Sequence, residues 1–264
     1  MLLNQLQNLV REVARAEVMP RFLNVDISEK EDGSMLSEAD LAAQAAFAHR
    51  LPAIIDSPML GEEMTSERQY ELWEQGEEEG LWVVDPIDGT NNFINGIPHF
   101  ALSVAYVKHG RTQLGVVYNP VIDECFYAER DRGAYLNGRH LPLRKVDKRL
   151  NQAVAGVEIK YLRSGKLSSR MNTLSPFGTI RSLGSSTLDW CYLASGRYDV
   201  YVHGGQKLWD YAAGALIFEE AGGQLATLEG DDFWSGEHVF KRSVIAALHP
   251  ELFQKWLAWI RNNQ

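Results

Sequence analysis

One short segment constrains this chain more than any other: an apolar run that ends in two closely spaced carboxylates and a Gly-Thr pair. Residues 82–93 read Trp-Val-Val-Asp-Pro-Ile-Asp-Gly-Thr-Asn-Asn-Phe. The apolar start predicts a buried strand that leads into Asp85 and Asp88, after which Gly89 and Thr90 can open a helix. Carboxylates at a strand end are hard oxygen ligands for divalent cations, and amides at a helix N-terminus bind anions. The segment therefore predicts metal-assisted phosphate chemistry; the alternative is a capped loop in which Asp88 is a plain N-cap.

The charge and hydropathy of the chain limit its partners. The net charge is −9 over 264 residues, which argues against a nucleic-acid partner. No segment reaches the roughly 18 apolar residues of a membrane span, and we expect no membrane partner. Arg11, Glu12 and Arg15 interrupt the apolar positions at the N-terminus, so this is not the pattern of a signal peptide.

The two cysteines, Cys125 and Cys191, lie in apolar stretches. Two residues of this spacing form neither a disulfide framework nor a zinc site, which favours a reducing compartment. We expect both to be small core residues, and the protein to be cytoplasmic.

Periodicity in the first fifty residues predicts two helices. Apolar residues repeat every three or four positions over residues 2–13, so the first helix should end near Pro20. The stretch 26–33 is charged and lacks periodicity, which indicates a loop. A second helix should begin at Ser37, whose spacing to Asp40 fits a capping box.

The rest of the chain predicts short strands and then alternating strands and helices. Strands are expected at 59–61, 81–84, 100–107, 115–118, 125–128, 153–159, 178–180, 200–202 and 244–248. Helices are expected at 187–195, 208–221 and 251–260. From residue 100 to about residue 143, the short β-rich runs predict a meander of antiparallel strands joined by hairpin turns. The turn signals are His109-Gly110, Asn119-Pro120, residues 131–133 and Asn137-Gly138. Together the elements predict a layered α+β fold.

Several acidic residues elsewhere could complete a metal site with Asp85 and Asp88. Glu62 follows a short apolar strand, Asp210 lies in the first turn of a predicted helix, and Asp40 lies near the start of another. Structural alternatives exist, because Asp210 would complement a helix dipole and Asp40 would partner a helix cap without any catalytic role.

The order and spacing of these blocks strongly resemble the inositol monophosphatase family. The resemblance covers Asp40 to Gly223 and rests on Gly61-Glu62-Glu63, residues 85–93, Trp209-Asp210 with Ala212-Ala213, and Glu220-Ala221-Gly222-Gly223. It implies a layered αβαβα sandwich, with an antiparallel sheet half and a mixed α/β half. It also implies a magnesium-dependent, lithium-sensitive phosphomonoesterase, which we expect to form a homodimer.

Metal ligands follow from this resemblance position by position. Glu62, Asp85 and the backbone carbonyl of Ile87 resemble the ligands of a first Mg²⁺ ion. Asp85 looks like the carboxylate shared with a second ion, which Asp88 and Asp210 complete. A third, weaker ion in such enzymes uses the Glu62 position and water, so two to three ions are expected.

Catalytic and phosphate-binding roles follow in the same way. The backbone amides of Gly89 and Thr90 resemble those that hold the phosphate, and Thr90 with Asp40 resembles the pair that orients the nucleophilic water. Glu62 is also expected to be catalytic, because it would hold the metal ion that takes part in the reaction. The chemistry agrees, because a phosphate dianion repels hydroxide until cations neutralise it, and a bound cation makes water more acidic.

The resemblance and the polar stretch 143–150 predict two halves. Residues 1–148 would form an N-terminal α+β half that carries most of the metal ligands. Residues 149–264 would form a C-terminal α/β half that carries Asp210 and the substrate loop.

Substrate contacts are expected from Asp88 and from a loop that aligns with the family's substrate pocket, which contains Gly184, Ser185 and Ser186. His203 stands seven residues before Asp210, where relatives specific for inositol phosphates usually carry a glutamate. It either bonds a substrate hydroxyl or is a satisfied strand-end histidine.

The stretch 157–164 contains Lys160, Tyr161 and Arg163. Its basic side chains would meet a second phosphate, or the stretch is a solvated helix start. The expected partner is therefore a small phosphorylated metabolite. Inositol monophosphate comes first; histidinol phosphate, fructose bisphosphate and adenosine 3′,5′-bisphosphate are alternatives. A partner-binding regulatory protein is the alternative of another class. Whether the loop 26–33, with Lys30, closes over the substrate stays open.

Overall fold

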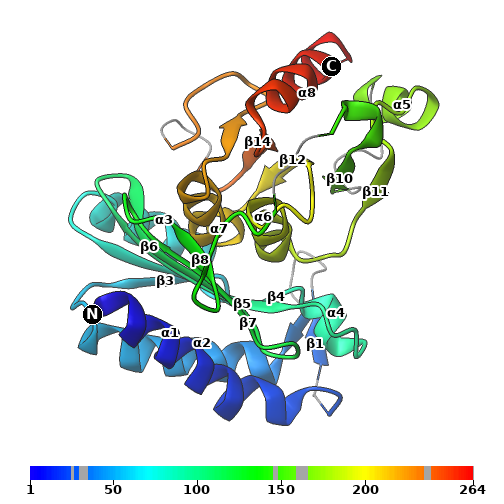
Figure 1. The fold of residues 1–264 in the computed structure, drawn as a ribbon. Helices are drawn as coiled ribbons and strands as arrows, with labels where there is room; N and C mark the ends of the chain where they lie inside the picture. Colours follow the sequence, from blue (N-terminus) through cyan, green and yellow to red (C-terminus); the bar gives the residue numbers. More distant parts are fainter. Residues whose placement is uncertain (25–26, 30–34, 145–147, 159–165, 235–238, 264) are drawn as a thin grey trace.

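The fold consists of five layers, alternately helical and β, in a computed structural model that describes residues 1–24, 27–29, 35–144, 148–158, 166–234 and 239–263. Helices α1 and α2 cover one face of a seven-stranded sheet, and α6 and α7 lie between this sheet and a five-stranded sheet (Figure 1). Helices α5 and α8 form the outermost layer. The expected αβαβα sandwich is confirmed.

The two N-terminal helices agree with their sequence signals. Helix α1 (Leu2–Val13) continues through a π turn (Ala14–Val18) and a 3-10 turn (Met19–Arg21), so the helical run ends just after Pro20. Helix α2 (Glu38–Arg50) begins after Ser37, whose backbone N–H donates to Asp40 Oδ2 at 2.9 Å. The predicted capping box is present, and it fixes the carboxylate of Asp40.

The first sheet has the strand order β3-β4-β5-β6-β7-β8-β9, in which β3 is parallel to β4 and every other pair is antiparallel. Its strands are β3 (Met59–Gly61), β4 (Leu81–Asp88), β5 (Ala101–Lys108), β6 (Arg111–Asn119), β7 (Glu124–Glu129), β8 (Ala134–Leu136) and β9 (Arg139–His140). The predicted meander is confirmed. Two of its turns, at His109-Gly110 and Asn137-Gly138, have positive φ at both residues, as two-residue hairpins of this hand require.

The second sheet is mixed, with the order β11-β10-β12-β14-β13. Its strands are β10 (Val154–Val157), β11 (Thr179–Arg181), β12 (Val200–Gln206), β13 (Gln224–Ala226) and β14 (Arg242–Ala247). Strand β10 is parallel to both β11 and β12, whereas β14 is antiparallel to β12 and β13. The helices of this part are α5 (Lys166–Thr173), α6 (Ser186–Ala194), α7 (Leu208–Glu220) and α8 (Pro250–Asn263).

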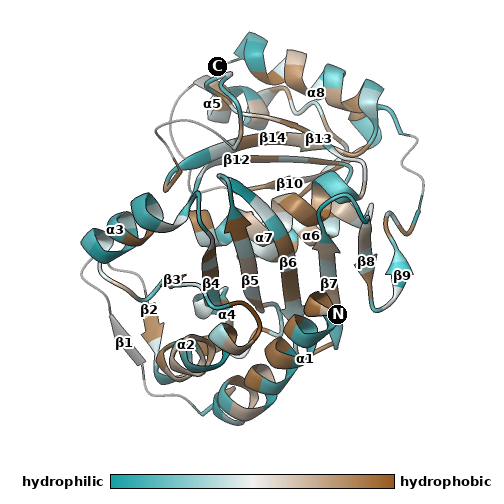
Figure 2. Ribbon diagram, turned by 90° about the vertical axis from the view of Figure 1, so that its left-hand side faces the viewer, coloured by the Kyte–Doolittle hydropathy of each residue, from teal (hydrophilic) through white to brown (hydrophobic). Residues whose placement is uncertain are grey.

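Burial explains the position of the central helices. Residues 211–218 of α7 are all buried, as expected for a helix covered by a sheet on each side. One buried cluster extends from Leu60 in β3 to Ile260 in α8, so the packing is continuous across both sheets. Figure 2 shows hydrophobic residues concentrated on β4 to β7, with a largely hydrophilic α3 outside. All strands of the first sheet precede residue 148 and those of the second follow it; the predicted boundary itself stays a prediction.

Three local predictions need correction or lie outside the described residues. The stretch 26–33 is not all loop, because Ile27–Glu29 forms β1 and pairs antiparallel with β2 (Met35–Ser37); residues 30–33, with Lys30, lie outside the described part. Lys160, Tyr161 and Arg163 also lie outside it.

Helix α3 (Ser66–Gly76) was not predicted, because its sequence is mostly polar and only Leu72 is a buried large apolar residue in it. No helix in the described residues is long and apolar enough to cross a membrane.

Candidate active site

The site forms where β4 ends and α4 (Thr90–Ile94) begins. Strand β4 extends to Asp88, four residues beyond the predicted end. Asp85 pairs with Ser103 and Asp88 with Ala101, so β4 carries one extra residue between the two pairs. In a regular strand, residues three apart face opposite sides. The extra residue of this bulge cancels one alternation, which lets both carboxylates face the same side.

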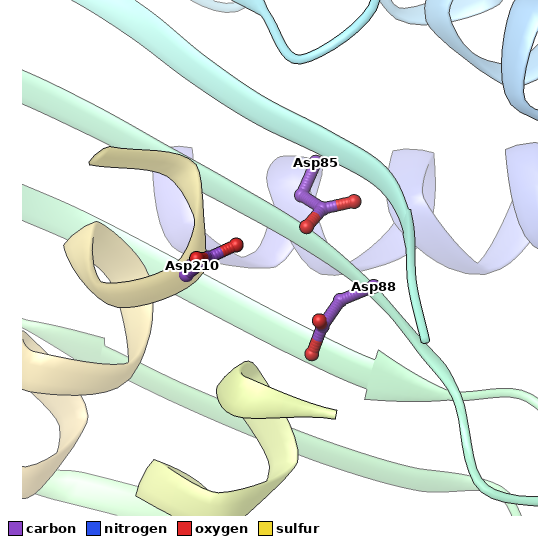
Figure 3. A group of neighbouring side chains, drawn as sticks. All are labelled: Asp85, Asp88 and Asp210. Carbon is purple, nitrogen blue, oxygen red and sulfur yellow. The ribbon is translucent and has the colours of Figure 1, made fainter. Parts of the chain in front are cut away.

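Helix α7 brings the third carboxylate. Asp210 lies in its first turn, and the backbone N–H of Lys207 donates to Asp210 Oδ2 at 2.8 Å. One carboxylate oxygen from each of Asp85, Asp88 and Asp210 lies within 4.8 Å of the others. Figure 3 shows the three side chains pointing toward one another from β4 and α7. The predicted convergence therefore occurs for these three residues.

Glu62 lies just outside this tight group. Its backbone N–H donates to the carbonyl of Val84 at 3.1 Å, and the Gln69 side chain donates to the Gly61 and Glu62 carbonyls, both at 3.0 Å. The end of β3 is thus held against β4, beside Asp85. The Glu62 carboxylate is close enough to contribute to the raised pKa of Asp85.

The electrostatics of the group fit a divalent cation. Asp85 is 1% exposed, and its Oδ1 has no hydrogen-bond partner among the described residues. Burial, followed by the negative charges of Glu62, Asp88 and Asp210, raises the pKa of Asp85 well above its usual range. Burial also raises the pKa of Asp88 and of Asp210. A bound cation satisfies such buried, mutually repelling oxygens, and oxygen donors suit Mg²⁺.

The other oxygen of Asp88 is held by the start of α6. Asp88 Oδ2 accepts hydrogen bonds from Ser185 Oγ at 2.5 Å and from the backbone N–H and hydroxyl of Thr187 at 2.7 and 2.6 Å. Sequence reasoning missed Thr187, because nothing local connects a threonine in one helix with an aspartate 99 residues earlier.

The Thr90 hydroxyl lies between two oxygen acceptors. It is 3.0 Å from the carbonyl of Ile87 and 3.4 Å from Asp40 Oδ1. Asp40 is fully buried, and its Oδ2 accepts from the Ser37 hydroxyl at 2.6 Å. The structure therefore brings Thr90, Ile87 and Asp40 together next to the carboxylate group.

Gly89 is required where β4 turns into α4. Its φ of 93° is in the left-handed region, and a Cβ there would lie 3.1 Å from the carbonyl of Gly184 and 3.2 Å from that of His99. A larger residue would be strained and would collide with backbone. This close approach brings the Gly184 loop against the start of α4, and Asn92 Nδ2 reinforces it by donating to the carbonyl of Leu183 at 2.8 Å.

Comparison with known proteins decides the family. The model of the inositol monophosphatase family matches residues 2–264. This chain belongs to the inositol monophosphatase family. The Nus factor SuhB of Pseudomonas aeruginosa is 34% identical over 96% of this chain and 90% of its own. The fructose-1,6-bisphosphatase/inositol-1-monophosphatase of Thermotoga maritima is 33% identical over 90% of each chain.

A solved structure agrees with the sequence relationship. The IMPase of Thermotoga maritima superposes with a TM-score of 0.82 at 31% identity, covering 98% of this chain and 96% of that one. Members of the inositol monophosphatase family are metal-dependent phosphatases, and this protein is accordingly a phosphoric monoester hydrolase.

The residues of this family member that are expected to contact substrate lie in two places. Gly184 is exposed, Ser186 half-buried and Ser185 buried, its hydroxyl donating to Asp88. His203 lies within β12, is 4% exposed, and its Nδ1 accepts the backbone N–H of Gly205 at 3.1 Å. A neutral His203 therefore carries its proton on Nε2. Their contact with substrate stays a prediction.

Proposed function

We propose that this protein hydrolyses a small phosphate monoester with two or three Mg²⁺ ions, and that inositol monophosphate is the first candidate substrate. The observation that carries the proposal is the group of Asp85, Asp88 and Asp210, whose carboxylate oxygens lie within 4.8 Å of one another. Bound Mg²⁺ would neutralise the phosphate dianion and make water acidic enough to supply a nucleophile at neutral pH.

The proposed metal ligands are the three aspartates, Glu62 and the carbonyl of Ile87. The Ile87 carbonyl lies 3.0 Å from the Thr90 hydroxyl. Even when that hydroxyl donates to it rather than to Asp40, the carbonyl oxygen has two lone pairs and retains one. Asp85 Oδ1 is buried and has no hydrogen-bond partner in the described part of the chain, so it can bind a cation without losing a contact there. Glu62, at the end of β3, adds its negative charge to that of the three aspartates.

The proposed catalytic residues outside the metal ligands are Thr90 and Asp40. When the Thr90 hydroxyl donates to Asp40 Oδ1, 3.4 Å away, its lone pairs can accept a hydrogen bond from the attacking water. Asp40 keeps this orientation because Ser37 holds its other oxygen. The backbone amides of Gly89 and Thr90, at the start of α4, are the proposed donors to the phosphate.

The test is phosphate release from a panel of substrates. Inositol monophosphate, histidinol phosphate, fructose bisphosphate and adenosine 3′,5′-bisphosphate are assayed with Mg²⁺, with a chelator, and with Mg²⁺ plus Li⁺. We expect Mg²⁺-dependent release that Li⁺ inhibits and that the chelator abolishes reversibly. Activity unaffected by the chelator, or no release from any of the four, would refute the proposal.

Substrate choice is proposed to depend on Asp88, Gly184, Ser185, Ser186 and His203. If the Nε2–H of His203 donates to the substrate, His203→Ala should raise KM for that substrate more than it lowers kcat. Equal KM values in wild type and variant would assign His203 to structure alone.

A cytoplasmic homodimer is the proposed state of the protein. Both cysteines are free and buried, which agrees with a reducing compartment. Light scattering at several concentrations would test the dimer, and a monomer at all of them would exclude it.

A second candidate function is regulation through a partner protein, because one relative is named Nus factor SuhB. Complementation of a gene deletion by a variant without turnover, such as Asp85→Asn, separates the two functions. Rescue by that variant would favour partner binding, whereas failure to rescue would favour catalysis.

A further inference from the structure

The start of α6 makes an unusual contact with the metal site. Three donors converge on a single oxygen, Asp88 Oδ2: Ser185 Oγ at 2.5 Å, the Thr187 backbone N–H at 2.7 Å and Thr187 Oγ1 at 2.6 Å. Asp88 is 8% exposed, Ser185 1% and Thr187 fully buried. Water therefore cannot readily replace any of these donors.

Asp88 takes the place of the missing cap of α6. The helix begins at Ser186, and its N-cap residue Ser185 makes no side-chain capping bond within the helix. Thr187 is the second helical residue, so its N–H has no intrahelical acceptor. Asp88 accepts from this N–H, and its negative charge is favoured at a helix N-terminus.

This arrangement leaves one oxygen of Asp88 for a cation. Three donors exceed the two lone-pair positions of a carboxylate oxygen, so Oδ2 is saturated and only Oδ1 is available toward Asp85 and Asp210. Asp210 shows a similar division, because its Oδ2 accepts the Lys207 N–H at 2.8 Å. In both residues the protein holds one oxygen and so restricts the orientation of the other.

We propose that Ser185 and Thr187 are positioning residues of the metal centre, which hold Asp88 Oδ2 so that Oδ1 is directed at the cation before it binds. The inference rests on the proposed function, since it requires a metal at the three carboxylates. Fixing the carboxylate in advance removes part of the entropy cost of binding. Helix α6 then connects the metal site in the first sheet with the second half of the chain.

The competing explanation is a purely structural one, in which Asp88 only caps α6. Under that explanation, removing a hydroxyl lowers the stability of the metal-free protein but leaves its affinity for Mg²⁺ unchanged. If the hydroxyls position Asp88, removing one instead lowers the affinity for Mg²⁺. Loss of a group that hydrogen-bonds a metal ligand typically lowers metal affinity by about 10- to 100-fold. Direct measurement of Mg²⁺ binding separates the two.

The experiment is calorimetric titration of metal-free full-length protein with Mg²⁺, accompanied by the shift in melting temperature that Mg²⁺ causes. Thr187→Val keeps the shape and the backbone N–H but removes the hydroxyl, and Ser185→Ala removes the other one. We expect each to raise the Kd for Mg²⁺ by about 10-fold, and Thr187→Ser to restore it to within about threefold. Ser195→Ala is the matched control, because Ser195 lies at the other end of α6 and its hydroxyl donates to the Tyr192 carbonyl at 3.1 Å, away from Asp88.

The outcomes distinguish this inference from the proposed function. Wild-type affinity in both Thr187→Val and Ser185→Ala, with only a lower melting temperature, would overturn the positioning role alone. Failure of the wild type itself to bind Mg²⁺ would overturn both. Should Thr187→Val not fold, Ser185→Ala decides the question in the same titration.

Discussion

Replacing Asp85 with asparagine should stabilise the metal-free protein while abolishing its response to metal. Asp85 is 1% exposed and shares the group with Asp88, which is 8% exposed. Two carboxylates within 4.8 Å repel by about 3.5 kcal/mol at an effective dielectric constant of about 20. Asparagine removes this repulsion, and its amide N–H groups can donate to the remaining carboxylates.

The observed gain should be smaller than the full repulsion. Burial and the neighbouring carboxylates raise the pKa of Asp85, so the metal-free protein relieves part of the strain by binding a proton. We therefore expect Asp85→Asn to increase the free energy of unfolding by about 1–3 kcal/mol at neutral pH in the absence of metal.

The raised pKa of Asp85 also determines how the stability of the metal-free protein depends on pH. Because the folded protein holds this proton to higher pH than the unfolded chain, the folded state binds more protons above the ordinary carboxyl range. The stability of the metal-free wild type should then fall as pH rises from about 4 upward. Asp85→Asn should show a shallower fall. Urea unfolding at pH 5 and pH 8, in the presence of a chelator, measures both slopes.

Adding Mg²⁺ should make the wild type more stable than Asp85→Asn, the reverse of the order expected without metal. Mg²⁺ should raise the melting temperature of the wild type and leave Asp85→Asn nearly unchanged, with turnover lost. Asp56→Asn, at an exposed position, is the control and should alter neither property. Destabilisation of the metal-free Asp85→Asn protein, or more than about a tenth of wild-type activity at saturating Mg²⁺, would refute the reasoning.

Three further predictions concern other parts of the molecule. Glu220 accepts backbone N–H groups of residues 131–133 at 2.9, 3.1 and 2.8 Å, so Glu220→Ala should lose about 1–3 kcal/mol in urea unfolding; an unchanged midpoint would contradict this. Thr90→Val should lower kcat by about 100-fold while Thr90→Ser retains most of it; equal kcat values for both would remove the hydroxyl from the reaction. Burial raises the pKa of Cys125 to about 12 and that of Cys191 well above its usual range, so a disulfide reagent should modify both only as fast as the protein unfolds; fast labelling of the folded protein would contradict their burial.

Local signals in the sequence were enough for many elements. The Ser37–Asp40 capping box, the Gly89 turn and the glycines of the hairpin turns each depend on neighbouring residues, and all are present as predicted. The family resemblance supplied the layered fold and the expected ligand set, since blocks as far apart as residues 61–63 and 220–223 occur in the family's order. Elements with a weak signal were missed: α3 and β9 lack the apolar periodicity that marks a buried face, and β8 (Ala134–Leu136) is only three residues long.

The sequence by itself determined which residues have the chemistry for a metal and a phosphate, because carboxylates after a strand and a glycine at a helix start are properties of a few adjacent positions. Only the tertiary structure decided how their side chains are oriented. The bulge that turns Asp85 and Asp88 to one face depends on pairing with β5, and the hold of Ser185 and Thr187 on Asp88 joins segments 97 and 99 residues apart. Such contacts arise from the packing of two sheets around α6 and α7, which no local pattern encodes.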